Sequence, residues 1–154
     1  MSQRVGTGYD SHRFQSGRRL VMGGVEIEHS QGLAGHSDAD VVTHAVIDAL
    51  LGAAGLGDLG SHFPTDEERW RDADSLDMLR TVLGMLPGPV INVDATVIAE
   101  EPSLSPHRAE MERNLSEAVG APVSVKATTN EGLGWIGRGE GIACIATALV
   151  EAAE

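Results

Sequence analysis

Apolar residues recur at helical spacing in the first third of the chain. Val41, Ala45, Leu50, Leu51 and Ala54 fall on one side of a helix that we expect to run from Ser37, as its N-cap, to about residue 54. A second helix is predicted by apolar residues at i, i+3, i+6, i+7 and i+10, namely Leu76, Leu79, Val82, Leu83 and Leu86. The run Pro87-Gly88-Pro89 then stops it.

A third helix is predicted to begin at Ser105, because Pro106 follows it at the first helical position, and to end near Val119. The intervening segments 55–72 and 132–141 are rich in glycine and polar residues, which predicts loops. Residues 32–36 form a third, shorter glycine-punctuated loop by the same criterion.

Alternation of apolar and polar residues predicts the strands. Residues 90–99 form a strand with Val93, Ala95, Val97 and Ala99 on one face. Residues 5–9, 123–128 and 142–150 are further strands, the first running out into a loop. Residues 20–27 read as two short strands joined by the Gly23-Gly24 turn, which is a common hairpin signal.

The order of these elements is not a regular β-α-β-α alternation. It predicts an α+β fold, with a mixed β-sheet, helices packed on one face and a small N-terminal β-hairpin. Since 154 residues match the common size of one domain and no linker or repeat is visible, residues 1–154 are expected to form a single domain.

The composition excludes several classes of partner. The formal net charge is −12, from 23 acidic and 11 basic residues, and such a field repels nucleic acid and anionic membranes. The chain has neither a signal segment nor ~18 consecutive apolar residues, so we expect a cytoplasmic protein. Cys144, the single cysteine, lies in an apolar run, which predicts a buried and inert thiol.

The first candidate chemistry lies in the segment Gly6 to Phe14. Asp10 and His12 are two residues apart, so in extended backbone their side chains share a face. A carboxylate and an imidazole are ligands for a borderline metal such as zinc, although an Asp that caps a turn and a His on a solvated loop fit the same residues.

A third metal ligand is available on the predicted helix from Ser37. Asp40, His44 and Asp48 recur at i, i+4 and i+8, either as a solvated helix face or as His44 completing the metal site. In the second case Asp48 or Asp40 would fix the tautomer of His44.

A second group of residues follows the strand that ends at Thr128. Thr128 and Thr129 lead into a glycine-rich segment whose hydroxyls and backbone N–H groups could bind a diphosphate. Arg138 could add a bidentate contact, and Glu131 could hold a hard cation such as Mg²⁺. Glycine-rich turns commonly have no such role, and the Gly-Lys-Thr/Ser signature is missing.

Several of these segments together resemble the 2-C-methyl-D-erythritol 2,4-cyclodiphosphate synthase family of the non-mevalonate isoprenoid pathway. The resemblance covers essentially the whole chain. It is carried by residues 6–14, 35–40, 48–54, 56–60, 63–64, 73–75, 92–94, 125–129 and 137–144, together with His44 and Glu131.

This resemblance implies a homotrimer with active sites at subunit interfaces and a metal-assisted cyclisation. Asp10, His12 and His44 would hold Zn²⁺, and Glu131 would hold Mg²⁺ or Mn²⁺. His36 and Thr129 fall where the family stabilises the transition state. The positions that match substrate contacts are Ser37, Asp58, Gly60, Phe63, Ala99, Ser103, Leu104, Ala127, Thr128, Trp135 and Arg138.

The implied substrate is a cytidine diphosphate ester, 4-diphosphocytidyl-2-C-methyl-D-erythritol 2-phosphate, with CMP as the leaving group. The chain departs from the family at Ser103, where relatives often have Lys, at residues 65–67, and at Asn130 and Trp135. Two alternatives stay open: a metal-dependent phosphohydrolase, and a non-catalytic trimer that binds isoprenoid phosphates.

Overall fold

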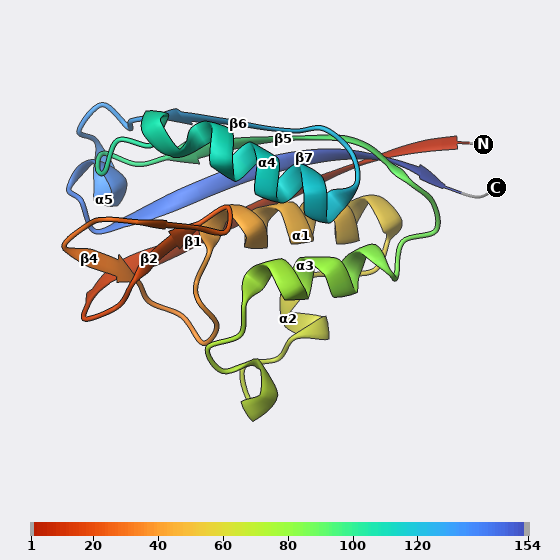
Figure 1. Cartoon of the computed structure of the whole chain (residues 1–154), viewed down its shortest axis with the longest axis horizontal. Coiled ribbons are helices and arrows are strands. Elements are labelled where there is room, and N and C mark those ends of the chain that lie inside the picture. The colour runs from red at the N-terminus through yellow and green to blue at the C-terminus, as the bar shows by residue number, and fades with distance from the viewer. Residues whose placement is uncertain (1, 153–154) are drawn as a thin grey trace.

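The computed structural model describes residues 2–152 of the chain. Figure 1 shows the strands running side by side, with α1 lying along them and α3 on the far side of α1. The elements in chain order are β1 (Ser2–Ser16), β2 (Leu20–Met22), β3 (Val25–Ile27), β4 (Gln31–Leu33), α1 (Val41–Ala54), α2 (Leu59–His62), η1 (Glu68–Trp70), α3 (Ser75–Leu83), β5 (Val90–Ile98), η2 (Ser105–His107), α4 (Arg108–Val119), β6 (Val123–Thr128), α5 (Gly134–Gly137) and β7 (Gly141–Ala152).

The strands form the mixed sheet that the sequence predicts. Among the described residues, five strands pair in the order β4-β1-β7-β5-β6. β1 pairs antiparallel with β7 along its length, whereas β5 and β6 are parallel. The predicted hairpin is confirmed as a separate two-stranded sheet of β2 and β3, whose turn needs positive φ at Gly23 and Gly24.

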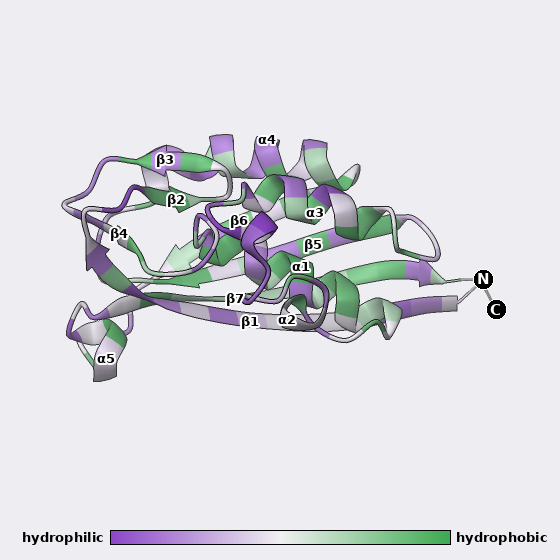
Figure 2. Ribbon diagram, turned by 90° about the horizontal axis from the view of Figure 1, so that it is seen from below, coloured by the Kyte–Doolittle hydropathy of each residue, from purple (hydrophilic) through white to green (hydrophobic). Residues whose placement is uncertain are grey.

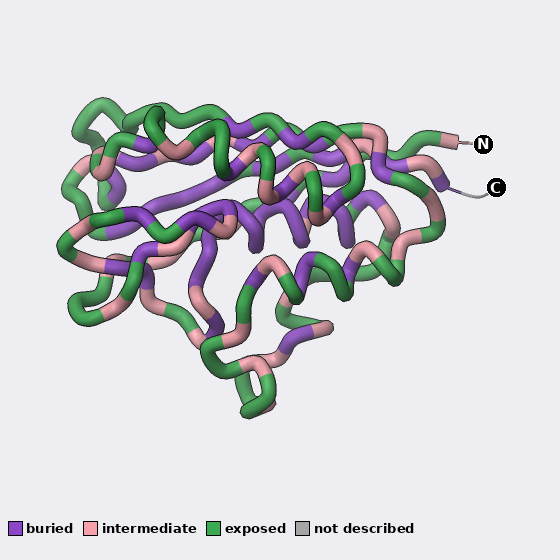
Figure 3. Tube along the Cα trace, viewed as in Figure 1, coloured by how far each residue is buried: buried purple, intermediate pink, exposed green. Residues whose placement is uncertain are grey.

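The helices cover one face of this sheet, as the α+β prediction requires. Side chains alternate between buried and more exposed positions along β5 and along β7 after its first four buried residues. Helix α1 packs on β7 and β5, and α4 packs on β6. Figure 3 shows α1 buried along most of its length, between the sheet and α3. In Figure 2, α4 carries hydrophilic residues on its outer side, while Met111, Leu115 and Val119 face the core.

Helix α1 lies so close to β1 that the strand has no room for side chains at two positions. A Cβ built on Gly8 would lie 2.0 Å from the carbonyl oxygen of Ala45, and one on Gly6 would lie 2.0 Å from that of Ala49. Both glycines are buried, and neither has a positive φ. They are therefore required by helix–strand contact rather than by backbone conformation.

The first helix begins later than predicted, because Asp40 rather than Ser37 is its N-cap. Asp40 Oδ1 accepts a hydrogen bond from Thr43 N at 3.0 Å. Ser37 Oγ accepts one from Ala39 N at 3.2 Å, inside a turn where Ala39 has φ +58°. Serine and aspartate are both favoured as N-caps, so the local sequence alone does not decide whether α1 is capped by Ser37 or by Asp40.

The other helix boundaries also differ slightly from the prediction. Ser105 opens the 3₁₀ turn η2 rather than an α-helix, and α4 follows it without a side-chain cap. Helix α3 ends at Leu83, one turn before the predicted stop, although its amphipathic spacing is confirmed. The loop predicted after residue 9 is wrong, since β1 continues to Ser16 by pairing with β7 and β4.

Three predicted loops contain short elements. Residues 31–33 pair with the end of β1 as the strand β4, and the glycine-rich segment after β6 contains the single turn α5. The segment 55–72 includes α2 and η1. Within the described part of the chain, no helix has the length and apolar character needed to cross a bilayer.

The contact between α1 and β1 predicts a strong asymmetry between two glycine substitutions. Gly8→Ala should lower the free energy of unfolding by at least about 2 kcal/mol, because the new methyl group would overlap backbone that cannot rotate away. Chemical denaturation followed by circular dichroism measures this change.

Gly52→Ala is the matched control on the same interface. A Cβ at Gly52 would meet its nearest neighbour at 3.8 Å, which is ordinary contact, and alanine favours a helix by about 1 kcal/mol over glycine. This variant should be as stable as the parent or more so. Equal stability losses in both variants would contradict the close-contact explanation.

Candidate metal centre and adjoining pocket

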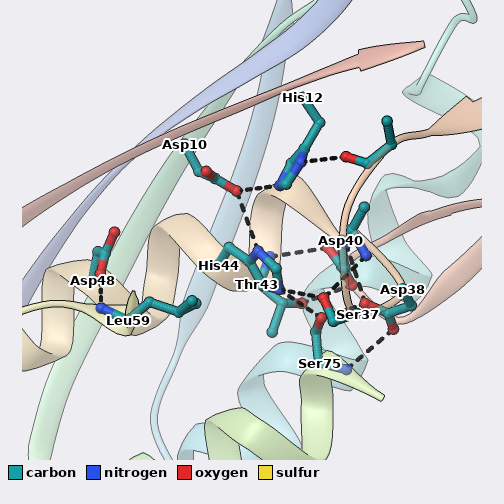
Figure 4. A network of polar contacts seen from close by, with 12 residues as sticks. Asp10, His12, Ser37, Asp38, Asp40, Thr43, His44, Asp48, Leu59 and Ser75 are labelled. Carbon is teal, nitrogen blue, oxygen red and sulfur yellow. Dashed lines mark hydrogen bonds and ion pairs between the residues drawn. The ribbon is translucent and has the colours of Figure 1, made fainter. Parts of the chain in front are cut away.

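The three predicted metal ligands meet at one point between β1 and α1. Figure 4 shows Asp10 and His12 projecting from the strand toward His44 on the helix. Asp10 Oδ2 lies 2.7 Å from His12 Nε2 and 3.3 Å from His44 Nδ1. Among residues 2–152, these three are the group whose ligand atoms all lie within 4.8 Å of one another. One carboxylate and two imidazoles are a donor set that suits zinc.

The charges of this group depend strongly on one another. Burial raises the pKa of Asp10, but hydrogen bonds from His12 and His44 outweigh it and bring the pKa down to about 2. Burial lowers the pKa of His12, yet the hydrogen bond and charge of Asp10 leave it raised above the usual value. A cation that binds here must displace the proton of His12, so its binding is favoured as the pH rises.

The second nitrogen of each imidazole is also hydrogen-bonded. His12 Nδ1 donates to the carbonyl oxygen of Ala34 at 2.7 Å, which leaves Nε2 facing Asp10. His44 Nε2 lies 2.8 Å from Ser75 Oγ and 3.2 Å from Ser37 Oγ. Ser37 therefore lies directly behind a predicted metal ligand, and it is buried.

The prediction that Asp40 or Asp48 fixes the tautomer of His44 is wrong. Asp40 points away from His44 and accepts hydrogen bonds from Gly23 N and Gly24 N, at 2.8 Å each, as well as from Thr43. Asp48 accepts one from Leu59 N at 2.7 Å. Positions i−4 and i+4 on a helix are neighbours, but here both carboxylates are taken by backbone donors from other segments.

Asp40 is instead a structural connection between the hairpin and the helix that carries His44. It is fully buried, and burial together with repulsion from Asp38 raises its pKa. Its oxygens accept from the turn of β2 and β3 and from the first turn of α1. This arrangement fixes the start of α1 relative to the hairpin.

Residues of the loop after α1 have mostly local contacts in this structure. Asp58 caps α2 by accepting hydrogen bonds from the backbone and hydroxyl of Ser61, and Gly60 lies inside that turn. Phe63 is buried, with its ring 4.7 Å from the ring of Trp70. His36 precedes α1 in the chain and contacts this loop, since its Nε2 is 3.1 Å from the carbonyl oxygen of Glu67.

A separate pocket contains the residues that the resemblance assigns to the cytidine end of the substrate. It has a volume of about 540 Å³ and lies between the segments that follow β5 and β6. Its walls include Ala99, Ser103, Leu104, Ala127, Thr128 and Thr129. The structure thus brings together residues that are about 25 positions apart in sequence, because β5 and β6 are parallel neighbours and both end here.

The turn after β6 presents Glu131 to solvent. Glu131 has φ +55°, and its N–H donates to Thr129 Oγ1 at 3.2 Å. Glu100, which lies in the range 99–104 that the resemblance assigns to the cytidine, accepts hydrogen bonds from Asn130 N at 2.6 Å and Gly132 N at 3.0 Å. No short-range signal marks Glu100, since its contacts are about 30 residues away in the chain.

Trp135 and Arg138 follow this turn, on α5 and directly after it, and Glu140 contacts both: its N–H donates to the carbonyl oxygen of Trp135 at 3.0 Å and its carboxylate pairs with Arg138. Trp135 lines a different pocket of about 480 Å³, whose walls also include His12 and Phe14. The guanidinium of Arg138 is paired with Glu140 at 2.6 Å and is exposed. In the isolated chain, neither residue touches the three convergent ligands.

Cys144 is buried, as predicted, and burial raises the pKa of its thiol. A thiol of this kind is a poor nucleophile at neutral pH. The chemistry of the site therefore depends on charged and polar groups rather than on a covalent intermediate at Cys144.

Comparison with known proteins gives consistent matches over nearly the whole chain. A family profile described as the YgbB family matches residues 3–151. A relative from Syntrophomonas wolfei named 2-C-methyl-D-erythritol 2,4-cyclodiphosphate synthase is 56% identical, with 97% of this chain and 99% of the relative covered.

Solved structures agree with this match. The bifunctional IspDF from Campylobacter jejuni has a TM-score of 0.93 at 36% identity, and the alignment covers 99% of this chain but 43% of that longer one. The IspF of Plasmodium falciparum, solved as a complex with CDP, has a TM-score of 0.84 at 32% identity, with 99% and 98% covered.

The coupling of Asp10 to His12 can be tested in protein kept free of divalent ions. Asp10→Asn should lower the pKa of His12, because burial, which disfavours the imidazolium, is then no longer opposed by the carboxylate of Asp10. NMR titration of the His12 ring measures this value. Asp77→Asn, which removes the same charge from an exposed position on α3, should leave it unchanged. A raised pKa that persists in Asp10→Asn would contradict the pairing.

Proposed function

The chain belongs to the YgbB family, and on this premise we propose that it converts 4-diphosphocytidyl-2-C-methyl-D-erythritol 2-phosphate to 2-C-methyl-D-erythritol 2,4-cyclodiphosphate with release of CMP. This makes it a cyclising phosphorus–oxygen lyase of the non-mevalonate isoprenoid pathway, with residues 1–154 as one synthase domain. The observation that carries the proposal is the convergence of Asp10, His12 and His44 in a chain 56% identical to a named synthase.

Asp10, His12 and His44 fit a zinc ion by the chemistry of their donors. Asp10 Oδ2, His12 Nε2 and His44 Nδ1 all face one another, and the other nitrogen of each imidazole is held by a hydrogen bond. Three protein ligands are typical of catalytic zinc sites, whereas closed structural sites have four. When bound, the ion supplies positive charge that neutralises phosphate oxygens of the substrate.

A second divalent ion, Mg²⁺ or Mn²⁺, fits Glu131 as a carboxylate ligand. The support is its exposed position on a turn fixed by Glu100, beside the pocket that contains Thr128 and Thr129. Carboxylate oxygens suit these hard cations, which are commonly shared with substrate phosphates. We place the cytidine diphosphate part of the substrate in that pocket, against Ala99 to Leu104 and Ala127.

The proposed reaction needs no nucleophile from the protein. The 2-phosphate attacks the β-phosphorus of its own diphosphate, the bond from that phosphorus to the CMP oxygen breaks, and CMP leaves. The residues of the chain hold the two phosphates in contact and oppose their mutual repulsion, which is the main contribution in phosphoryl transfer.

His36 and Thr129 are the groups we assign to transition-state stabilisation. Ser37, Asp58, Gly60 and Phe63 are assigned to the methylerythritol phosphate, and Trp135 and Arg138 to the diphosphate side.

A homotrimer with shared sites is the assembly we propose. Two observations support it: the metal centre and the cytidine pocket have no lining residue in common, and the face of the sheet opposite the helices is partly apolar. On that face Tyr9 and Ile145 are direct partners across β1 and β7, and they are 54% and 43% exposed. Exposed apolar residues in adjacent strands favour contact with another chain.

Incubation with the cytidylyl substrate separates the proposal from its alternatives. The synthase produces the cyclic diphosphate and CMP, a phosphohydrolase produces linear products, and a binding trimer gives no turnover.

His44→Ala should abolish zinc binding and lower turnover by several orders of magnitude, because one of three ligands is lost. His107→Ala, which removes an imidazole outside the cluster, should keep its zinc. Full zinc content in His44→Ala would refute the metal assignment.

Light scattering tests the assembly. The parent protein should have a mass near three times that of the 16.2 kDa chain. Ile145→Asp should yield smaller species with little activity, since it buries a charge in the proposed contact, whereas Arg113→Asp on the exposed side of α4 should remain trimeric. A monomer with full activity would overturn the shared-site proposal.

A further inference from the structure

The two nitrogens of His44 face different partners, and these partners determine which nitrogen carries a proton and which can ligate an ion. Nδ1 lies 3.3 Å from Asp10 Oδ2, on the side where the three proposed ligands meet. Nε2 lies 2.8 Å from Ser75 Oγ, on the side of α3. His44 and Ser75 are both buried, so water does not compete freely for these contacts.

Asp38 determines the direction of the hydrogen bond between Ser75 and His44. Ser75 Oγ is hydrogen-bonded to Asp38 Oδ1, and Ser75 N donates to Asp38 Oδ2 at 3.1 Å (Figure 4). A carboxylate can only accept, so the hydroxyl proton of Ser75 is directed to Asp38. The lone pairs of Ser75 Oγ are then left for His44, whose Nε2 must donate.

The result is a ring that keeps a proton on Nε2 and turns Nδ1 toward Asp10. Nδ1 donates to the carboxylate when no ion is bound, and it offers a lone pair once a cation displaces that proton. His12 reaches the matching state by a different contact, because its Nδ1 donates to the carbonyl oxygen of Ala34 and its Nε2 faces Asp10. His44 Nδ1 and His12 Nε2 therefore converge on the same point, where each can ligate a cation that displaces its proton.

We propose that Ser75 and Asp38 are positioning residues that hold His44 in the Nε2-protonated form, with Nδ1 directed at the divalent ion. They contact neither the ion nor the substrate, and they act through the ring of His44. The inference rests on the proposed function in so far as His44 is a metal ligand. The geometry also explains why a serine with no exposed surface occupies the first position of α3.

The hydrogen bonds of Asp38 link the loop before α1 to the start of α3, next to the ring of His44. Asp38 lies in the loop before α1, and its N–H donates to the carbonyl oxygen of Ala73, just before α3. The two serine–carboxylate bonds and this backbone bond join the loop to α3 on one side of the ring. Hydrogen bonds of this kind to a ligating histidine are worth about 10- to 100-fold in metal affinity.

The first experiment measures the tautomer of His44 without any metal. Two-bond ¹H–¹⁵N correlation spectra of EDTA-treated protein at pH 8 should show a proton on His44 Nε2, whether or not Nδ1 also carries one facing Asp10. In Ser75→Ala the fraction of this form should fall, with the longer contact to Ser37 remaining. A parent ring whose Nε2 carries no proton would overturn the proposal, whether or not the protein binds zinc.

The second experiment measures zinc affinity by competition with a chromophoric chelator. Ser75→Ala should bind Zn²⁺ about 10- to 100-fold more weakly than the parent. Asp74→Ala is the matched control, because Asp74 caps the same helix by accepting from Leu76 N at 2.8 Å but does not touch His44. It should destabilise α3 and leave the zinc affinity within twofold of the parent value.

A third variant keeps the test decisive if Ser75→Ala does not fold. Asp38→Asn preserves the size of the side chain but removes the charge that orients the Ser75 hydroxyl, so zinc affinity should again fall. Parent-like affinity in a folded Ser75→Ala or Asp38→Asn protein would refute the positioning role. A parent that binds no zinc would refute the proposed function instead, while the tautomer measurement would still decide this inference.

Discussion

The direct contact of helix α1 with the backbone of β1 is the constraint on which the site depends. Gly6 and Gly8 give the helix a surface without side chains, and the carbonyl oxygens of Ala45 and Ala49 occupy the space where a Cβ would be. The next inward positions of the same strand carry Asp10 and His12. Because the helix is already close to the strand, the side chain of His44 reaches Asp10 without any loop rearrangement.

This contact places several carboxylates near one another in a chain of net charge −12, and each has its own donors. Asp10 faces two imidazoles, Asp38 is bound to Ser75, and Asp40 accepts from backbone N–H groups of the hairpin and of α1. Buried charge is tolerated when hydrogen bonds satisfy it. The negative groups thus build the frame of the candidate site, and in the proposed function the positive charge that phosphates require comes from bound cations and from Arg138.

The parts of the fold that could be predicted are those governed by local periodicity. The alternation in residues 90–99 and the hairpin at Gly23 and Gly24 were correct, because each pattern is determined by neighbours within a few residues. The helix start was misplaced, since Ser37 and Asp40 both satisfy the N-cap preference and only the hairpin turn selects Asp40. The strand β1 was predicted too short because pairing with β7 and β4, which lie far away in sequence, extends it.

The sequence by itself determined the ligand types, the shared face of Asp10 and His12, and the helix that carries His44, because spacing along a strand or helix fixes direction. Only the tertiary structure decided which groups stand behind those ligands. Ser75 and Asp38 orient His44, and Glu100 holds the turn of Glu131, through contacts that span about 30 residues or more. Such contacts leave no periodic signal, since they depend on how two elements pack and not on the spacing within either one.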